Sequence, residues 1–164
     1  MGCLSCANEK DIHNIDDINI NKVFSEHRKY RQIHNTEDII ILSQKLCEKA
    51  NEKISKLIEK DDGEFIDDEN EEELGANLFI SSQGKVDVIK ICESWYNEKD
   101  KYDFGKSKYQ KGTGHFTQMI WKETKEVGFG YGISKSNKFY FLAYYYPAGN
   151  EIGKFKENVL KEKL

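Results

Sequence analysis

Residues 114–121 read Gly-His-Phe-Thr-Gln-Met-Ile-Trp and give the strongest indication of the fold. Phe116, Met119 and Ile120 recur at i, i+3 and i+4, which predicts the buried stripe of a short helix. His115 falls in the first turn of this helix, beside a hydroxyl, an amide and an indole. Two interpretations are open: a histidine that is hydrogen-bonded within the core, or a residue of a functional site.

Four other stretches accompany this one. They read Phe-Leu-Ala-Tyr-Tyr-Tyr-Pro-Ala-Gly-Asn at 141–150, Gly-Ala-Asn-Leu at 75–78, Trp-Tyr-Asn-Glu at 95–98 and His-Arg-Lys-Tyr-Arg at 27–31. Together they resemble the signatures of the CAP superfamily, which includes cysteine-rich secretory proteins, antigen 5 and pathogenesis-related proteins. The resemblance implies an α/β fold, a three-layer α-β-α sandwich. In layout the chain is similar to the Golgi-associated plant pathogenesis-related subgroup, which carries an N-terminal acylation site.

The resemblance also implies a cleft that in many members binds zinc through two histidines and two glutamates, ligands that suit a divalent ion. His115 and Glu98 match one histidine and one glutamate of this set. Ala76 stands at the position of the other glutamate, and no histidine lies between His34 and His115. Two ligands are too few, so we predict a degenerate metal site without a cofactor. We expect Glu98 and His115 to form a hydrogen-bonded pair that organises the cleft.

The remaining signature residues are expected to hydrogen-bond or to pack in the cleft walls. A metal-dependent protein and a weak hydrolase that uses Glu98 and His115 are the alternative functions. The candidate nucleophiles near the first signature are Thr113 and Thr117, but no Ser-His-Asp constellation can be assembled. We therefore predict no catalytic residues. The signature residues with an expected structural role are Asn77, Thr117, Gln118, Trp121, Tyr145 and Asn150.

The chain opens with Met-Gly-Cys-Leu-Ser-Cys, which resembles a dual acylation site. Removal of the initiator methionine would expose Gly2 for N-myristoylation, with Cys3 and Cys6 as palmitoylation candidates. The match is imperfect, because the general pattern has Ser or Thr at position 6. One myristoyl chain binds a bilayer with an association constant of only about 10⁴ per molar, so a palmitate would be needed for stable attachment. The alternative is an unmodified N-terminus with two free thiols.

Cysteine usage and hydropathy indicate the compartment. No apolar segment follows a basic start, so no secretory signal is visible. No apolar run approaches the length of a membrane span. Cys47 and Cys92 fall in apolar helical patterns and are expected to be small buried hydrophobes, as suits a reducing compartment. We expect the cytoplasmic face of a membrane, with the Golgi as a candidate.

Charge is unevenly distributed. The chain has 25 basic and 29 acidic residues, and nine of the acidic ones lie in the block Asp61–Glu73. We expect this block to be a solvated, disordered insertion. Without it, 25 basic against 20 acidic residues leave a charge of +5. Such a body suits an anionic leaflet at about 1 kcal/mol per basic residue near the surface. The lysines expected to contribute are Lys106, Lys108, Lys111, Lys154, Lys156, Lys161 and Lys163.

The length of 164 residues suits one domain, which we place at residues 16–160 after a flexible lead, residues 1–15. Hydrophobic periodicity predicts helices over 16–34, 38–59, 86–98 and 115–121, and strands over 127–133 and 139–146. A pI near 5.7 and the lack of a basic-aromatic motif argue against nucleic-acid binding. The sequence therefore predicts a membrane-anchored, non-catalytic module that binds anionic lipid or sterol, a protein partner, or both. A homodimer is a candidate state.

Overall fold

The computed structural model describes residues 18–163, apart from residues 36, 38, 66–72 and 85. Within these residues, four strands form the middle layer: β1 (Ile41–Leu42), β2 (Gly75–Ser81), β3 (Glu126–Ile133) and β4 (Phe139–Tyr146). Their order in the sheet is β1-β3-β4-β2. β1 pairs with β3 in parallel, while β4 pairs antiparallel with both β3 and β2. The hairpin of β3 and β4 is therefore the centre of the sheet.

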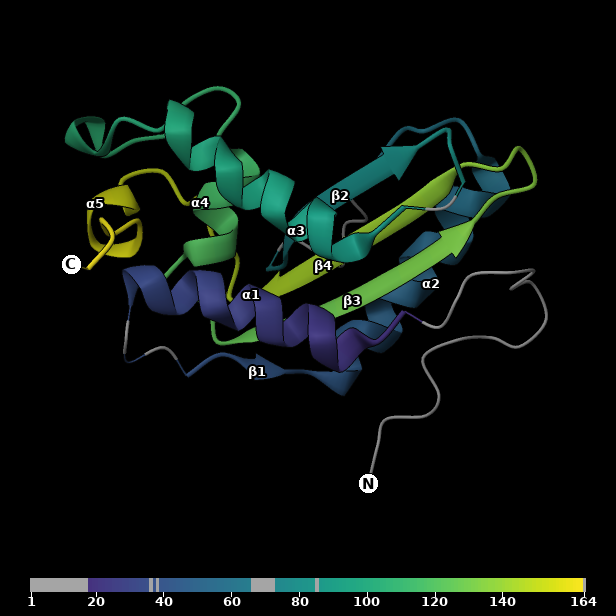
Figure 1. Cartoon of the computed structure of the whole chain (residues 1–164), viewed down its shortest axis with the longest axis horizontal. Helices are drawn as coiled ribbons and strands as arrows, with labels where there is room; N and C mark the ends of the chain where they lie inside the picture. Colours follow the sequence, from purple (N-terminus) through teal and green to yellow (C-terminus); the bar gives the residue numbers. More distant parts are fainter. Residues whose placement is uncertain (1–17, 36, 38, 66–72, 85, 164) are drawn as a thin grey trace.

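Helices cover both faces of this sheet (Figure 1). One face packs against α2 (Gln44–Lys60), and the other against α1 (Ile20–His34), α3 (Val88–Asn97) and α4 (Gly114–Ile120). A short α5 (Phe155–Asn158) follows the sheet near the C-terminus. This three-layer α-β-α sandwich confirms the predicted fold class.

The consecutive tyrosines of β4 show how the sheet divides the core. Tyr144 is buried in the cluster on the α2 side, and Tyr145 is buried in the larger cluster under α1, α3 and α4. Tyr146 is exposed at the end of the strand. Successive side chains of a strand point to opposite faces, so Tyr144 and Tyr145 pack in the cores on the two sides of the sheet.

Glycines in β3 bring α2 unusually close to the sheet. A Cβ atom on Gly128 would lie 2.3 Å from the backbone nitrogen of Cys47, and one on Gly130 would lie 2.5 Å from the carbonyl carbon of Ala50. Real Cβ atoms essentially never approach other atoms so closely. The backbone of α2 therefore packs directly on the strand, at positions where no larger residue fits.

Two strands are not predicted by the sequence. The expected helix over 38–59 is wrong at its start, because Ile41 and Leu42 pair with Glu126 and Val127 in β1. The α2 helix begins only at Gln44. β2 is also missed, since its pairing with β4 joins residues 58 to 70 positions apart. The predicted boundaries of the other elements differ from the observed ones by a few residues.

Polar side chains set the starts of α1 and α3. Asn19 accepts a hydrogen bond from the backbone N–H of Lys22 at 3.1 Å, and Asp87 accepts one from Ile89 at 2.9 Å. Such caps satisfy N–H groups that have no partner within the helix. Apolar periodicity does not mark a cap, which is why the predicted helices over 16–34 and 86–98 begin too early.

The acylation motif lies outside the described residues, as does the centre of the acidic block. The first residue of that block is held in place: Asp61 accepts a hydrogen bond from the Tyr140 hydroxyl at 3.0 Å and forms an ion pair with Lys138 at 3.3 Å. At the other end of the block, the carbonyl of Glu73 accepts from the N–H of Ala148. In the part of the chain that the structure describes, no helix has the length and apolar character needed to span a bilayer.

Candidate functional site

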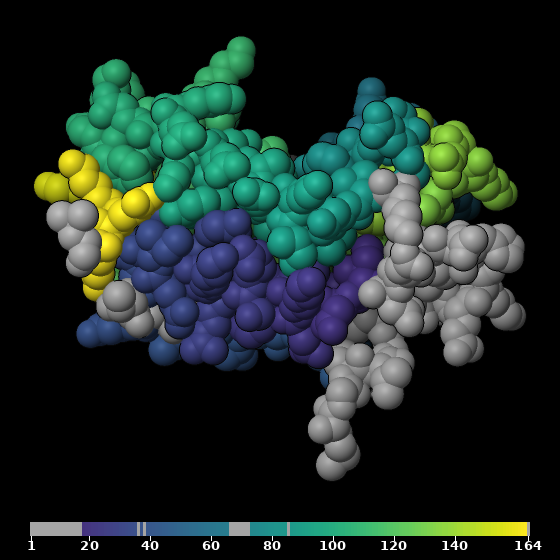
Figure 2. All heavy atoms as spheres, viewed as in Figure 1, coloured from purple at the N-terminus to yellow at the C-terminus, as the bar shows by residue number. Residues whose placement is uncertain are grey.

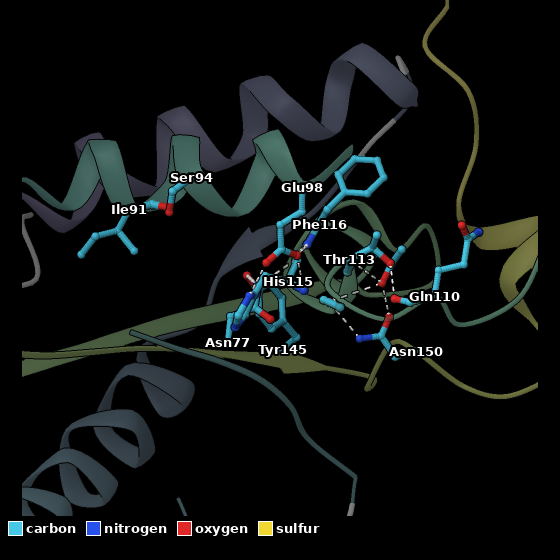
Figure 3. A network of polar contacts seen from close by, with 12 residues as sticks. Asn77, Ile91, Ser94, Glu98, Gln110, Thr113, His115, Phe116, Tyr145 and Asn150 are labelled. Atoms are coloured by element: carbon cyan, nitrogen blue, oxygen red, sulfur yellow. Dashed lines mark hydrogen bonds and ion pairs between the residues drawn. The ribbon is translucent and has the colours of Figure 1, made fainter. Parts of the chain in front are cut away.

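The histidine of α4 and the glutamate that follows α3 lie side by side (Figure 3). Nδ1 of His115 is 2.7 Å from Oε1 of Glu98. The exposed fraction of the side chain is 41% for His115 and 19% for Glu98, so the pair lies at the boundary between core and solvent. The indole of Trp95, three residues before Glu98 on the same helical face, stacks on the imidazole with ring centroids 5.7 Å apart.

Glu98 also caps the helix that carries its partner. Its Oε2 accepts from the backbone N–H of His115 at 3.0 Å and from that of Phe116 at 3.1 Å. Thr113 occupies the N-cap position of α4 but makes no side-chain cap bond. A carboxylate far away in the sequence therefore does the work of an N-cap and also compensates the positive end of the helix dipole.

These contacts fix the protonation state of Glu98. Burial alone would raise the pKa of its carboxyl, but the hydrogen bond and charge of His115, together with the N–H groups of Phe116 and His115, lower the pKa below its ordinary value. The carboxylate is thus ionised at neutral pH. It accepts three hydrogen bonds within the protein, and both of its oxygens take part.

A chain of buried polar contacts runs from this pair to α1. The side-chain amide of Asn77 donates to the carbonyl of His115 at 3.0 Å and to the hydroxyl of Tyr145 at 3.2 Å. That hydroxyl lies 2.8 Å from Nε2 of His27. Which of the two groups donates in this hydrogen bond depends on the tautomer of His27. Burial first, and the charge of Arg31 second, lower the pKa of His27 to about 3.

Arg31 ties α1 to the far end of α4. Its guanidinium is almost completely buried and donates to the carbonyls of Met119 at 2.9 Å, Trp121 at 3.0 Å and Thr124 at 3.0 Å. These carbonyls lie at the C-terminus of α4 and in the turn that follows, where the helix leaves acceptors without partners. Both ends of the helix that presents His115 are therefore satisfied by side chains from other elements.

A third set of contacts closes the N-terminal turn of α4. The hydroxyl of Thr117 lies 2.5 Å from Oδ1 of Asn150, and the amide of Asn150 donates to the carbonyl of Gly114 at 3.0 Å. Thr113 donates its hydroxyl to the carbonyl of Gln110 at 2.7 Å. Both threonines are fully buried. These hydroxyls hold the loops together, and neither is placed as a nucleophile.

Comparisons with known proteins agree with this architecture. A family model described as CAP, the cysteine-rich secretory protein family, matches residues 24–146. The chain is a member of the CAP family. Over 149 residues it is 33% identical to human Golgi-associated plant pathogenesis-related protein 1, covering 87% of this chain and 93% of the relative.

Solved structures of distant relatives show the same fold. The venom allergen-like protein 4 of Schistosoma mansoni superposes with a TM-score of 0.63 at 19% identity, covering 88% of this chain and 94% of that one. The structure of NaASP2 with Zn²⁺ gives a TM-score of 0.64 at 21% identity, covering 87% of this chain and 85% of that one. At such identities the likeness concerns the fold alone.

The residues at the CAP cleft do not fit a zinc site. Glu98 uses both oxygens, and His115 uses Nδ1, in contacts within the protein. Ala76 carries no ligand atom, and its register with Tyr144 places it on the α2 face of the sheet, opposite to Asn77. Within the described residues, no group of three or more His, Cys, Asp or Glu side chains is arranged to hold a metal ion.

The other CAP signature residues fill a tight space behind α4. The side-chain oxygen of Gln118 accepts from the N–H of Gly149 at 2.8 Å and lies 1.9 Å from where a Cβ on Gly75 would stand. Trp121 is fully buried and meets Phe155 edge to face at 5.1 Å between centroids. Glycines at 75 and 149 are thus required by the volume of the residues they face.

Some residues of the site carried no role in the sequence prediction. Trp95 stacks on the imidazole from α3. Its position three residues before Glu98 indicates that both side chains lie on the same helical face. The sequence shows His27 and Arg31 only as part of a signature, because nothing local indicates that they contact Tyr145 and the end of α4. The surface is hollowed above α3, between residues 98–112 and the end of β2 (Figure 2).

Proposed function

We propose that this CAP domain is a non-catalytic module, attached to the cytoplasmic face of a membrane by N-terminal acyl chains. Its body binds anionic lipid or sterol, a protein partner, or both, without a metal. The observation that carries the non-catalytic half is the use of Glu98: its carboxylate caps α4 and holds the imidazole of His115. A general base or a metal ligand needs an oxygen that is available to substrate or metal.

The membrane half is supported by the sequence and by one relative. Gly2, Cys3 and Cys6 form the acylation motif, and the chain without its acidic block has a charge of +5. The human relative at 33% identity bears a name that associates it with the Golgi. A single myristoyl chain gives only marginal binding, so a palmitate or a basic surface is needed as a second signal.

Co-sedimentation with vesicles tests the membrane half. The protein acylated with myristate at Gly2 and palmitate at Cys3 is compared with the Gly2→Ala variant on neutral and on anionic vesicles at two salt concentrations. We expect the acylated protein to sediment with both kinds of vesicle and the variant to lose binding to neutral ones. Equal binding of the two proteins would remove the anchor from the proposal.

Calorimetric titration with Zn²⁺ tests the metal-free half. We expect the wild-type protein and the His115→Ala variant to give the same weak heats. A wild-type dissociation constant in the micromolar range or below, lost in the variant, would show that the pair binds metal and would favour a metal-dependent function.

A further inference from the structure

One exposed isoleucine is presented at the tip of an ordered turn. The side chain of Ile152 is 91% exposed, the largest exposure among the large hydrophobic residues that the structure describes. The N–H of Lys154 donates to the carbonyl of Glu151 at 3.1 Å, so Ile152 and Gly153 are the central residues of a closed turn. Gly153 has a φ of +89°, as the third position of a type II turn requires. The turn therefore holds an apolar side chain out in water.

A second exposed hydrophobic residue lies on a neighbouring loop. Tyr109 is 56% exposed, and its ring lies 3.6 Å from the position of a Cβ on Gly114. The same glycine accepts the hydrogen bond from Asn150, which begins the loop that carries Ile152. Tyrosine suits the interface of a bilayer, because its ring is apolar and its hydroxyl remains hydrated.

The segments that carry both residues are rich in lysine. Residues 99–112 and 151–163 contain nine lysines and five carboxylates, a net charge of +4. This is most of the +5 that the chain carries outside its acidic block. Lys99 forms an ion pair with Glu162, which shows that the two segments lie against each other. We call the surface formed by residues 99–112 and 149–163 the lysine-rich end, and Figure 1 shows both segments at the same end of the molecule.

We propose that the lysine-rich end docks on an anionic bilayer, with Ile152 and Tyr109 entering the headgroup region. This inference rests on the proposed function and names the surface through which the body would contact the membrane. Its occupant is a lipid surface, because exposed apolar side chains on a surface of net positive charge match the apolar and anionic layers of such a surface. Lys108 precedes Tyr109, Lys111 follows it by two residues, and both are exposed.

The lysine-rich end and the N-terminal anchor can reach the same bilayer. The described chain begins next to the N-terminus of α1, and this helix of 15 residues is about 22 Å long. The seventeen preceding residues span at most about 60 Å when fully extended. An acyl chain at Gly2 thus does not prevent the opposite end of α1 from facing the membrane.

Fluorescence quenching by brominated lipids tests this orientation. The native tryptophans, Trp95 and Trp121, are buried and give a constant background. In the Gly2→Ala background, Ile152→Trp is compared with Ile39→Trp, a matched control at a residue that is 68% exposed and lies just before β1, outside the lysine-rich end as defined. On anionic brominated vesicles we expect strong quenching for the variant at 152 and little for the control.

Binding measurements complete the test. In the Gly2→Ala background, Ile152→Asp should weaken binding to anionic vesicles at least about tenfold, whereas Ile39→Asp should leave it unchanged. Lys108→Glu combined with Lys111→Glu should weaken it about a hundredfold and reduce its salt dependence. Circular dichroism verifies that each variant is folded.

The outcomes separate this inference from the proposed function. Equal quenching at 152 and 39, or equal losses for the two aspartate variants, would overturn the lysine-rich end as the docking surface. Failure of the Gly2→Ala protein to bind any vesicle would overturn it as well. In that last case, binding of the acylated protein would still support the proposed anchor.

Discussion

Glu98 both caps α4 and orients His115, and two substitutions of this residue separate the two roles. In Glu98→Ala the N–H groups of His115 and Phe116 lose their acceptor, at about 1 kcal/mol each, as for a lost N-cap. The ion pair adds less than about 1 kcal/mol, because the imidazole is 41% exposed and is screened by water. The total loss in the free energy of unfolding is about 2–3 kcal/mol. This corresponds to a melting temperature about 5–10 °C lower.

In Glu98→Gln the consequence is different. The amide oxygen can still accept from both backbone N–H groups, so the loss in the free energy of unfolding should be below about 1 kcal/mol. The amide nitrogen then faces Nδ1 of His115 and can only donate to it. The imidazole must therefore carry its proton on Nε2, whereas in the wild-type protein Nδ1 donates to the carboxylate.

Urea unfolding followed by tryptophan fluorescence measures the stabilities, and nitrogen-15 NMR of the histidine rings reports the tautomer. The reasoning fails if Glu98→Ala stays within about 0.5 kcal/mol of the wild-type protein, because the cap would then be dispensable. It also fails if Glu98→Gln leaves the proton of His115 on Nδ1. As a control, Glu93→Gln changes an exposed carboxylate on α3, the helix that Glu98 follows.

Three further predictions concern the framework around the site. Gly130→Ala should destabilise the protein by about 1–3 kcal/mol or more, because its Cβ would stand 2.5 Å from the backbone of α2. Thermal unfolding measures this loss. Gly114→Ala is the control for an added methyl group, because its Cβ would lie in ordinary contact at 3.6 Å from its nearest neighbour. Arg31→Met should cost at least about 3 kcal/mol in urea unfolding, since it leaves three carbonyls without their donor; a cost below about 1 kcal/mol would mean that water replaces the guanidinium. The pKa of His27 is about 3 in the folded protein, against 6.5 for a fully solvated histidine, so the unfolded state binds the proton first as the pH falls. The free energy of unfolding should decline by about 1.4 kcal/mol per pH unit from this group between pH 6 and pH 3, and His27→Gln should remove that part of the slope; equal slopes in the two proteins would contradict the buried, neutral imidazole.

The sequence predicted the elements whose periodicity is strong and local. The stripes of α2 and α3 and the alternation in β4 follow from burial on one side or both sides of an element. β1 is only two residues long and has no period of its own, so its residues were absorbed into the helix that follows. β2 owes its conformation to β4, and no pattern within Gly75–Ser81 announces that pairing.

For the site, the sequence indicated residue types but not the contacts between them. The types and positions of Glu98 and His115 suggested a pair only through the resemblance to CAP proteins. Nothing in the residues shows that Glu98 accepts two backbone N–H groups, a contact that depends on how α3 delivers its C-terminal end to the start of α4. The buried connection from Asn77 through Tyr145 to His27 joins three elements and is likewise invisible without the fold.

The strand order β1-β3-β4-β2 bears on how the chain folds during synthesis. The two edge strands come from the first half of the chain, and the central hairpin comes from the second half. On the ribosome, β1 and β2 have no partner until residues 126–146 have emerged. Their pairing is of high contact order, which slows folding and leaves apolar edges exposed in the nascent chain. The sheet is thus completed only near the end of translation, and a fragment that stops before β3 cannot form this fold.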